Sequence, residues 1–201
     1  MPQIILASQS PRRKKLLDQI GLSFQVFPSN AEEISSQRDP VLLVEELALL
    51  KASDVSSNFS DAFIIGADTI VVHNNEIIGK PENGEDAARL LSTLSNSTHD
   101  VYTGVAFVKT DKNRQITAKH TFYEQTKVTF SALEPQDINA YIKSGSPLDK
   151  AGAYGIQDDL GALFVERIEG DYYNVVGFPL NRFYRELKKF MPDMSLMTKK
   201  L

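Results

Sequence analysis

Two serines and a run of four cations meet at a predicted strand-to-helix junction near the start of the chain. Ser8 and Ser10 follow a short apolar strand, and Pro11 opens a helix whose next residues, 12–15, are Arg-Arg-Lys-Lys. A Ser cap followed by Pro is an ordinary helix start. Four cations there are unusual, because the N-terminus of a helix already favours anions. Backbone N–H groups, hydroxyls and guanidinium groups all bind anions, so this junction predicts a phosphate site.

Helical spacing directs the two arginines of this run toward the protein body. Arg13 shares a face with Leu17 and Ile20, and Arg12 lies on an edge of that face with Leu16. The alternative is a solvated basic turn with no ligand.

A single carboxylate interrupts the most apolar strand predicted in the chain. Asp68 stands in the middle of residues 63–72, with Gly66 and Ile70 as its neighbours at period two. A carboxylate on such a face needs a cation, a metal or a polar site to satisfy it. The alternative is a structural Asp satisfied at a strand end or bulge.

One lysine extends the apolar stripe of a predicted helix at 41–56. Val44, Leu47 and Lys51 follow the helical repeat. This lysine either snorkels to solvent or points from the wall of a cleft at phosphate oxygens.

A second lysine follows a predicted hairpin. If residues 74–75 form a two-residue turn, His73 pairs with Glu76, and the same register places Lys80 opposite Thr69. Lys80 is then one residue away from the level of Asp68, or it is a solvated lysine at the edge of the sheet.

Two loops add candidate ligands. Glu32 and Glu33 lie in a polar loop; such acids are usually only solvated, but beside a polyphosphate they could hold Mg²⁺ or Mn²⁺. Gln157 ends a glycine-containing segment at 148–157, and its amide could read the edge of a nucleobase.

The composition excludes several classes of protein. The chain has 201 residues, a net charge of −4 and no cysteine, which excludes disulfides and thiol chemistry and disfavours a nucleic-acid binder. The spacing of its three histidines does not match that of metal ligands. No stretch approaches a membrane span or a signal peptide, so we expect a cytoplasmic protein with one domain at 1–190 and a frayed tail at 191–201.

Periodicity and turn residues predict alternating strands and helices early in the chain and long strands later. This order indicates an α/β fold with a mixed sheet. The expected strands are 3–7, 23–28, 62–72, 76–79, 99–109, 114–130 and 163–168, and the expected helices are 11–20, 41–56, 84–95, 135–144 and 179–190.

Three separated segments together resemble the Maf family of nucleoside triphosphate pyrophosphatases. They are residues 6–13, residues 66–71 with 79–81, and residues 149–157. The last segment is similar to the branch that acts on dTTP and UTP. The resemblance implies an elongated mixed central sheet with flanking helices and two lobes around a cleft, as in inosine triphosphate pyrophosphatases. It also implies a divalent metal cofactor (Mg or Mn), a cytoplasmic location and a possible homodimer.

Each matching position carries an expected role from the family. The resemblance implies a catalytic base at Asp68, base-specificity residues at Arg12, Thr69 and Gln157, phosphate-binding residues at Ser8, Arg13, Lys51 and Lys80, and a metal-associated acid at Glu33 beside Asp68. The chain departs from the commoner pattern at 158–159, where two aspartates follow Gln157.

The activity implied is hydrolysis of dTTP and UTP, and of base-modified pyrimidine triphosphates, to the monophosphate and pyrophosphate. The alternative is a nucleotide-binding regulator of cell division and septum formation without turnover. A phosphomonoesterase is disfavoured because no Asp-x-Asp pattern precedes Thr69. No nucleic-acid or membrane partner is expected.

Overall fold

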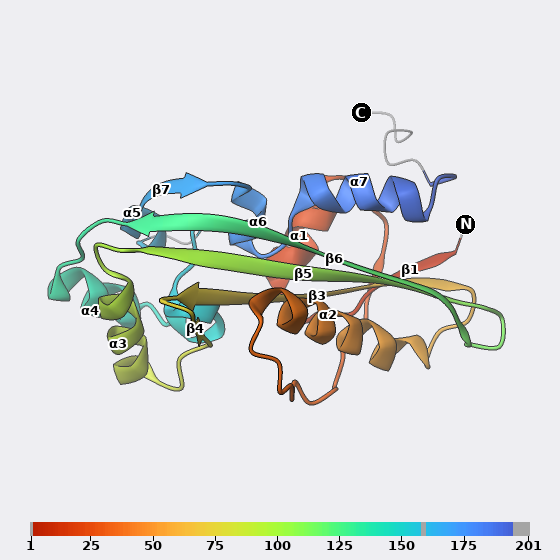
Figure 1. The fold of residues 1–201 in the computed structure, drawn as a ribbon, viewed down its shortest axis with the longest axis horizontal. Helices are drawn as coiled ribbons and strands as arrows, with labels where there is room; N and C mark the ends of the chain where they lie inside the picture. Colours follow the sequence, from red (N-terminus) through yellow and green to blue (C-terminus); the bar gives the residue numbers. More distant parts are fainter. Residues whose placement is uncertain (1, 158–159, 195–201) are drawn as a thin grey trace. The chain divides into compact units, whose positions relative to one another are not determined.

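The computed structural model describes residues 2–157 and 160–194, and it contains a mixed sheet with helices packed on it (Figure 1). The described strands are β1 (Gln3–Leu6), β2 (Gln25–Val26), β3 (Ala62–His73), β4 (Glu76–Ile78), β5 (Thr98–Thr110), β6 (Ile116–Phe130) and β7 (Val165–Glu169). Their order in the sheet is β2-β1-β3-β5-β6-β7, and β4 pairs with β3. β1 pairs in parallel with β2 and β3, whereas β4 and β7 pair antiparallel with their neighbours. The mixed α/β fold expected from the sequence is therefore confirmed.

Helices and short helical turns connect these strands. The α-helices are α1 (Pro11–Gln19), α2 (Pro40–Ser56), α3 (Gly84–Leu94), α4 (Pro135–Lys143), α5 (Gly161–Phe164), α6 (Tyr172–Val176) and α7 (Leu180–Phe190), and the 3₁₀ turns are η1 (Ser146–Asp149) and η2 (Ala151–Ala153). No described helix has the length and apolar character needed to cross a membrane.

The chain divides into two compact units. Unit 1 comprises Met1–Asp68, Thr103–Glu124 and Gly177–Leu201, and unit 2 comprises Thr69–Tyr102 and Gln125–Val176. The single domain expected at 1–190 stays a prediction. The frayed tail expected at 191–201 lies outside the described residues from position 195 onward.

Most expected elements are confirmed, and the differences are local. The strand expected at 23–28 is reduced to the two residues of β2. The strand expected at 163–168 begins only at Val165, because residues 161–164 form the helical turn α5. The sequence also missed α6, a five-residue helix with too little periodicity to detect.

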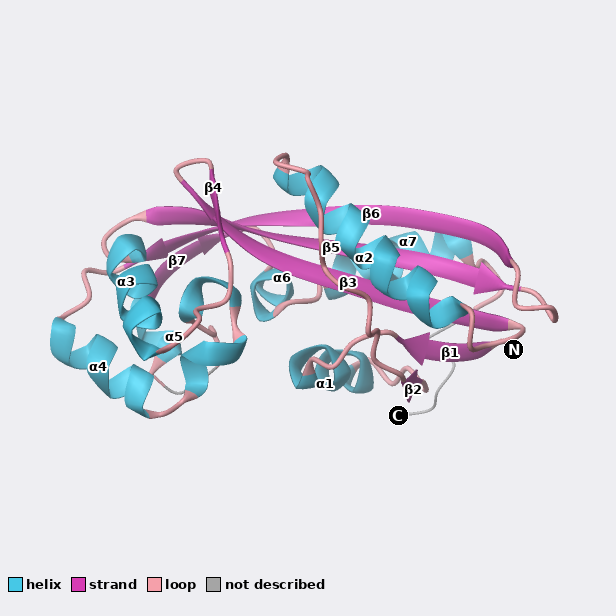
Figure 2. Ribbon diagram, turned by 90° about the horizontal axis from the view of Figure 1, so that it is seen from below, coloured by secondary structure: helices cyan, strands magenta, loops and turns pink. Residues whose placement is uncertain are grey.

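Alternating side chains on the strands of unit 1 create two apolar faces. Phe63 and Phe107 contact each other on one face, and Phe107 also contacts Phe183 and Phe190 of α7. The opposite face carries Ile64 and other aliphatic residues that form a buried cluster with α2. In Figure 2, α2 and α7 accordingly lie on opposite sides of the strands.

Two glycines let α2 lie directly against the sheet. A Cβ atom on Gly66 of β3 would stand 2.2 Å from the carbonyl oxygen of Ala48, and one on Gly104 of β5 would stand 2.2 Å from that of Val44. Both carbonyls belong to α2. Because backbone cannot move aside as a flexible side chain can, these positions require glycine, and they fix the depth at which α2 sits.

Unit 2 has its own core. Buried side chains of α3 pack with residues of the adjoining strands, of α4 and of the glycine-containing segment, including Leu91, Val128, Tyr141 and Tyr154. Aromatic rings meet edge to face in this core: Tyr141 contacts Phe164, with ring centroids 5.2 Å apart.

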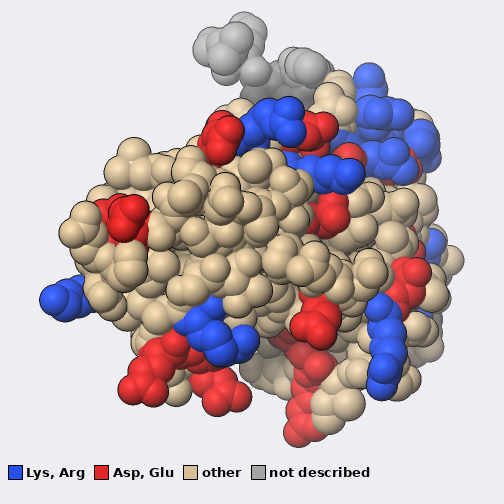
Figure 3. Space-filling model, turned by 60° about the vertical axis from the view of Figure 1, so that its left-hand side comes forward, with Lys and Arg blue, Asp and Glu red and all other residues tan. Residues whose placement is uncertain are grey.

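The face of the molecule in Figure 3 is covered mainly by side chains other than Lys, Arg, Asp and Glu. Charged residues of both signs lie at several places on it, and Lys and Arg side chains gather at its upper right.

Replacing Gly66 with Ala should destabilise the protein by about 1–3 kcal/mol or more, because α2 must move away from β3. Urea unfolding followed by circular dichroism measures this loss. Gly79→Ala is the matched control, since a Cβ there meets nothing within 4 Å. That control should leave the free energy of unfolding unchanged or slightly raised. An equal effect of the two substitutions would contradict the close approach of α2.

Candidate active site

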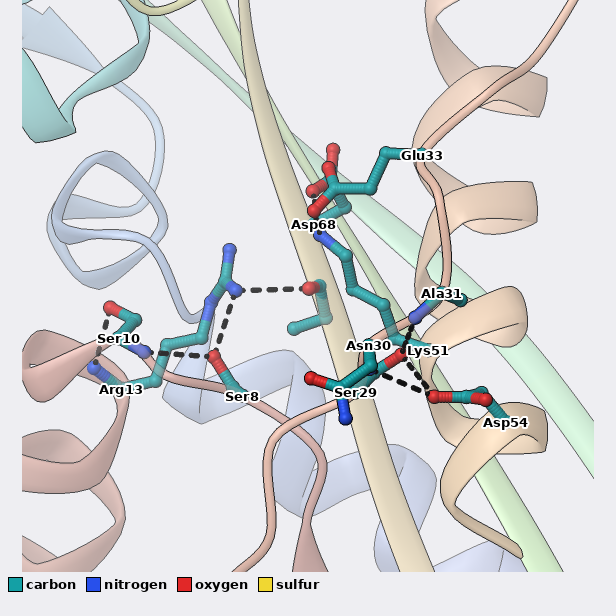
Figure 4. A network of polar contacts seen from close by, with 11 residues as sticks. Ser8, Ser10, Arg13, Ser29, Asn30, Ala31, Glu33, Lys51, Asp54 and Asp68 are labelled. Atoms are coloured by element: carbon teal, nitrogen blue, oxygen red, sulfur yellow. Dashed lines mark hydrogen bonds and ion pairs between the residues drawn. The ribbon is translucent and has the colours of Figure 1, made fainter. Parts of the chain in front are cut away.

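The junction between β1 and α1 is ordered by its two serines. The buried Oγ of Ser8 accepts a hydrogen bond of 3.2 Å from the backbone N–H of Ser10. Ser10 is the N-cap of α1, and its side chain accepts from the backbone N–H of Arg13. The chain therefore turns into α1 as the sequence predicted, with Ser8 held at the base of the turn (Figure 4).

Arg13 ties three separate segments of unit 1 together. Its Nη1 donates to Ser8 Oγ at 3.2 Å and to the carbonyl of Ala67 at 2.9 Å, and its Nε donates to the carbonyl of Gly177 at 3.0 Å. These bonds join the start of α1 to β3 and to the segment before α7. The expectation that Arg13 leans into the protein body is confirmed.

Burial lowers the pKa of Arg13, and the nearby carboxylate of Asp68 opposes that shift. Arg12, which lies partly buried on the first turn of α1, adds a smaller lowering effect. A guanidinium group stays charged under all ordinary conditions. Arg13 thus places a fixed positive charge close to Asp68.

Asp68 is satisfied by the lysine that extends the stripe of α2. Lys51 Nζ donates to Asp68 Oδ1 at 2.6 Å, and both side chains are about nine-tenths buried. The contact follows from the close approach of α2 at Gly66, because Asp68 is the next residue on the same face of β3. Lys51 is therefore held by a buried partner rather than by solvent.

Glu33 reaches the same ammonium group from the loop between β2 and α2. Its Oε1 lies 2.9 Å from Lys51 Nζ, and its side chain is 47% exposed. Figure 4 shows the carboxylates of Glu33 and Asp68 meeting at the tip of Lys51. One cation is thus flanked by two carboxylates that lie 35 residues apart in the chain.

The loop that carries Glu33 is fastened to α2. Asp54 Oδ2 accepts from Ser29 Oγ at 2.7 Å and from the backbone N–H of Asn30 at 3.0 Å. Further along the loop, Ser35 Oγ donates to Glu46 Oε2 at 3.0 Å. Glu33 lies between these two attachments, so Asp54 and Glu46 limit where its carboxylate can go.

Sequence reasoning missed these attachments. Asp54 and Glu46 are exposed polar positions on a helix, and nothing in their spacing distinguishes them from solvated residues. The carbonyls of Ala67 and Gly177 also carry no signal, because every residue has a carbonyl group.

Three of the expected site residues belong to unit 2. Thr69 is partly exposed in β3, Lys80 is exposed just after β4, and Gln157 is exposed in a turn. The predicted pairing of His73 with Glu76 is confirmed. The paired strand ends at Ile78, however, so Lys80 lies outside the ladder in which it was expected to face Thr69.

The glycine-containing segment of unit 2 is anchored beside Lys80. Gly152, at a φ of +70°, donates its backbone N–H to the carbonyl of Gly79 at 3.0 Å. Tyr141 Oη accepts from the backbone N–H of Gly155, two residues before Gln157. The two aspartates at 158–159, which depart from the family pattern, lie outside the described residues.

A buried histidine supports this segment, although its sequence context predicted no role. His99 Nε2 lies 2.8 Å from Tyr154 Oη, and the two rings meet edge to face. Burial lowers the pKa of His99 to about 3 and raises the pKa of Tyr154, so both groups are neutral at ordinary pH. His99 thus acts on the segment through a neutral hydrogen bond.

The chemistry of the donor set around Lys51 fits a divalent cation. Glu33 and Asp68 offer hard oxygen donors that already converge on one cation. Mg²⁺ sites in nucleotide enzymes commonly use one or two carboxylates, with phosphate and water oxygens completing the shell. No group of three or more acidic, histidine or cysteine side chains suited to a metal occurs within residues 2–157 and 160–194.

Comparison with known proteins places the chain in a family. The family model for Maf-like protein matches residues 3–190, and the chain belongs to this family. A dTTP/UTP pyrophosphatase of Agathobacter rectalis is 48% identical over 207 residues, covering 96% of this chain and all of the relative. A dTTP/UTP pyrophosphatase of Bacillus cereus is 50% identical over 196 residues, covering 97% and 99% of the two chains.

Two solved structures are more distantly similar. The Staphylococcus aureus Ham1 protein matches 64% of this chain and 71% of its own at 15% identity, with a TM-score of 0.47. A nucleoside-triphosphatase, dITP/XTP pyrophosphatase, of Mycobacterium abscessus matches 94% and 99% of the two chains at 11% identity, with a TM-score of 0.44.

Replacing Asp54 with Ala should release the loop that carries Glu33. A hydrogen bond to a charged acceptor contributes about 1.5–3 kcal/mol, so the amide of Asn30 should exchange with solvent at least about tenfold faster. Hydrogen exchange followed by NMR measures this rate. Asp18→Ala removes an exposed acid from α1 and should leave the rate unchanged. Equal exchange in wild type and Asp54→Ala would show that Asp54 does not hold the loop.

Proposed function

We propose that this protein hydrolyses dTTP and UTP to the nucleoside monophosphate and pyrophosphate. The observation that carries the proposal is the contact of Lys51 with both the buried Asp68 and the exposed Glu33. It occurs in a chain about half identical to proteins named dTTP/UTP pyrophosphatase over nearly their full length. Base-modified pyrimidine triphosphates are further candidate substrates.

The reaction needs an attacking water and a base to receive its proton. Water adds to the α-phosphorus, the bond from that phosphorus to the bridging oxygen breaks, and pyrophosphate leaves. Asp68 is our candidate for the base, because it is the carboxylate embedded in β3 beside both Lys51 and the charge of Arg13. A proton delivered to Asp68 would weaken its ion pair with Lys51.

The cations of the site have a separate role in this proposal. Catalysis of phosphoryl transfer depends mainly on positioning and on stabilising negative charge. Arg12, Arg13 and Lys51 are the candidates in unit 1, with Ser8 supporting Arg13, and Lys80 is the candidate in unit 2.

A divalent metal, Mg²⁺ or Mn²⁺, belongs to the same proposal. When bound, it would neutralise phosphate charge and lower the pKa of a bound water. Glu33 and Asp68 would hold it, and the attachment of the loop to Asp54 would keep Glu33 in place.

Base recognition is proposed for Arg12, Thr69 and Gln157. The amide of Gln157 offers one acceptor and one donor group, which suits a pyrimidine edge. The hydrogen bond from Gly155 to Tyr141 supports this assignment, because it fixes the backbone two residues before Gln157.

A nucleotide-binding regulator of cell division without turnover is the alternative. Such a protein needs affinity for the nucleotide but no general base, so it has no need of a buried carboxylate at Asp68 paired with Lys51. Release of pyrophosphate from dTTP in the presence of Mn²⁺ separates the two functions directly. Absence of turnover with intact nucleotide binding would favour the regulator.

Replacing Asp68 with Asn should lower kcat by about 10²–10⁴-fold, the usual contribution of a general base. Pyrophosphate release measures kcat, and a fluorescent nucleotide measures binding, which should persist. Asp18→Asn, in an exposed pair with Lys14, is the matched control and should retain full activity. A fully active Asp68→Asn protein would rule out Asp68 as the base.

Replacing Gln157 with Ala should change the ranking among nucleobases more than the rate on the best substrate. Loss of one base-edge hydrogen bond corresponds to about a tenfold loss of discrimination. Values of kcat/KM for dTTP, UTP, dCTP and dGTP measure the ranking. Gln136→Ala, on the exposed surface of α4, is the control. If the ranking is the same in all three proteins, Gln157 does not read the base.

A further inference from the structure

The ammonium group of Lys51 contacts the carboxylates of both Asp68 and Glu33. Its Nζ lies 2.6 Å from Asp68 Oδ1 and 2.9 Å from Glu33 Oε1. Both distances are those of direct, charge-assisted contacts. The Lys51 side chain is only 12% exposed, so water provides little of its solvation.

The charge of Arg13 also acts on these two carboxylates, but Lys51 is the cation whose direct contacts with both of them are given above. Two carboxylates so close together repel each other, and the carboxylate of Asp68 is almost entirely buried. Burial of an unpaired charge is strongly unfavourable. The ammonium group neutralises one of the two negative charges and contacts both.

The same two oxygens are the donors that would bind a divalent metal. An ammonium group and a metal ion would compete for them, because both require direct contact with the carboxylates and repel each other at short range. Lys51 carries its ammonium group on a flexible four-carbon stem, so the charge can move away from the two carboxylates while α2 stays in place.

We propose that Lys51 is the resident counter-cation of the Glu33–Asp68 pair and leaves this position when a divalent cation binds there. The proposal deepens the function proposed above and rests on its metal site. Once released, the Lys51 ammonium becomes available to the phosphate oxygens of the substrate. The Lys51 ammonium group thus contacts the two carboxylates before metal and nucleotide bind, and the phosphates of the nucleotide afterwards.

Coupling between metal and nucleotide follows from this exchange. Metal alone must displace Lys51 into solvent, where the ammonium has no anionic partner. Metal arriving with a nucleotide provides that partner at the same time. Binding of metal should therefore be weak without nucleotide and stronger with it.

The test is a titration with Mn²⁺ alone, in which electron paramagnetic resonance measures free Mn²⁺ and no nucleotide is present. Replacing Lys51 with Met preserves the apolar stem but removes the charge. We expect Lys51→Met to bind Mn²⁺ at least about tenfold more tightly than wild type, because the competing cation is gone and the carboxylates repel each other. Lys51→Gln provides a second variant that retains a polar end.

Two control variants separate local from general effects. Lys14→Met removes a cation from an exposed pair with Asp18 and should bind Mn²⁺ as wild type does. Lys51→Met combined with Glu33→Gln should lose the gain in affinity, since one of the two carboxylates is then neutral. Circular dichroism establishes that each protein is folded.

Unchanged or weaker Mn²⁺ binding by both Lys51→Met and Lys51→Gln would overturn the proposal. If neither variant folds, the wild type still provides a test through the ¹⁵N resonance of the Lys51 ammonium. Mg²⁺ with a non-hydrolysable dTTP analogue should shift this resonance and leave that of Lys14 in place. An unshifted Lys51 resonance would contradict the exchange.

These results are independent of turnover. The Mn²⁺ titration can fail while pyrophosphate release stays intact, which would leave the proposed function standing without the exchange. If the wild type releases no pyrophosphate but Lys51→Met binds Mn²⁺ more tightly, the exchange is retained and the proposed reaction is removed.

Discussion

The candidate site depends on how closely one helix approaches the sheet. Gly66 and Gly104 have no side chain, so the backbone of α2 lies directly on β3 and β5. This contact brings Lys51 within 2.6 Å of Asp68. Moving α2 away from the sheet would increase the distance between them, because Lys51 is attached to α2 and Asp68 to β3.

Charge balance is the second organising constraint in unit 1. The buried carboxylate of Asp68 is paired with Lys51 and lies near Arg13, while Arg13 itself is fixed by backbone carbonyls of Ala67 and Gly177. Glu33 joins this group from a loop that is itself attached to α2 by Asp54. Lys51 and Asp68 thus stand on a helix and a strand, and the loop that carries Glu33 is held to α2 by hydrogen bonds. Such support is what precise positioning of reacting groups requires.

The local sequence predicted helices and strands well where a capping or turn residue fixes the backbone conformation. Ser10 with Pro11 marked the start of α1, and the Asn74-Asn75 turn, with both residues at positive φ, set the register of β3 and β4. Prediction was weaker at short elements: β2 keeps only two residues of the expected strand, and α6 went unnoticed. Such elements depend on tertiary packing more than on propensity.

The sequence by itself determined which residues were candidates for chemistry: a carboxylate in an apolar strand, a lysine on an apolar stripe and a basic helix start. It could not determine their partners. The carbonyl of Gly177, which accepts from Arg13, lies 164 residues away along the chain. It belongs to the backbone, so the type of residue at that position does not indicate the contact. The meeting of Glu33 with Lys51 also depends on the path of a loop without periodicity. Only the tertiary structure decides such contacts, because they arise from packing between segments whose separation along the chain carries no information about distance in space.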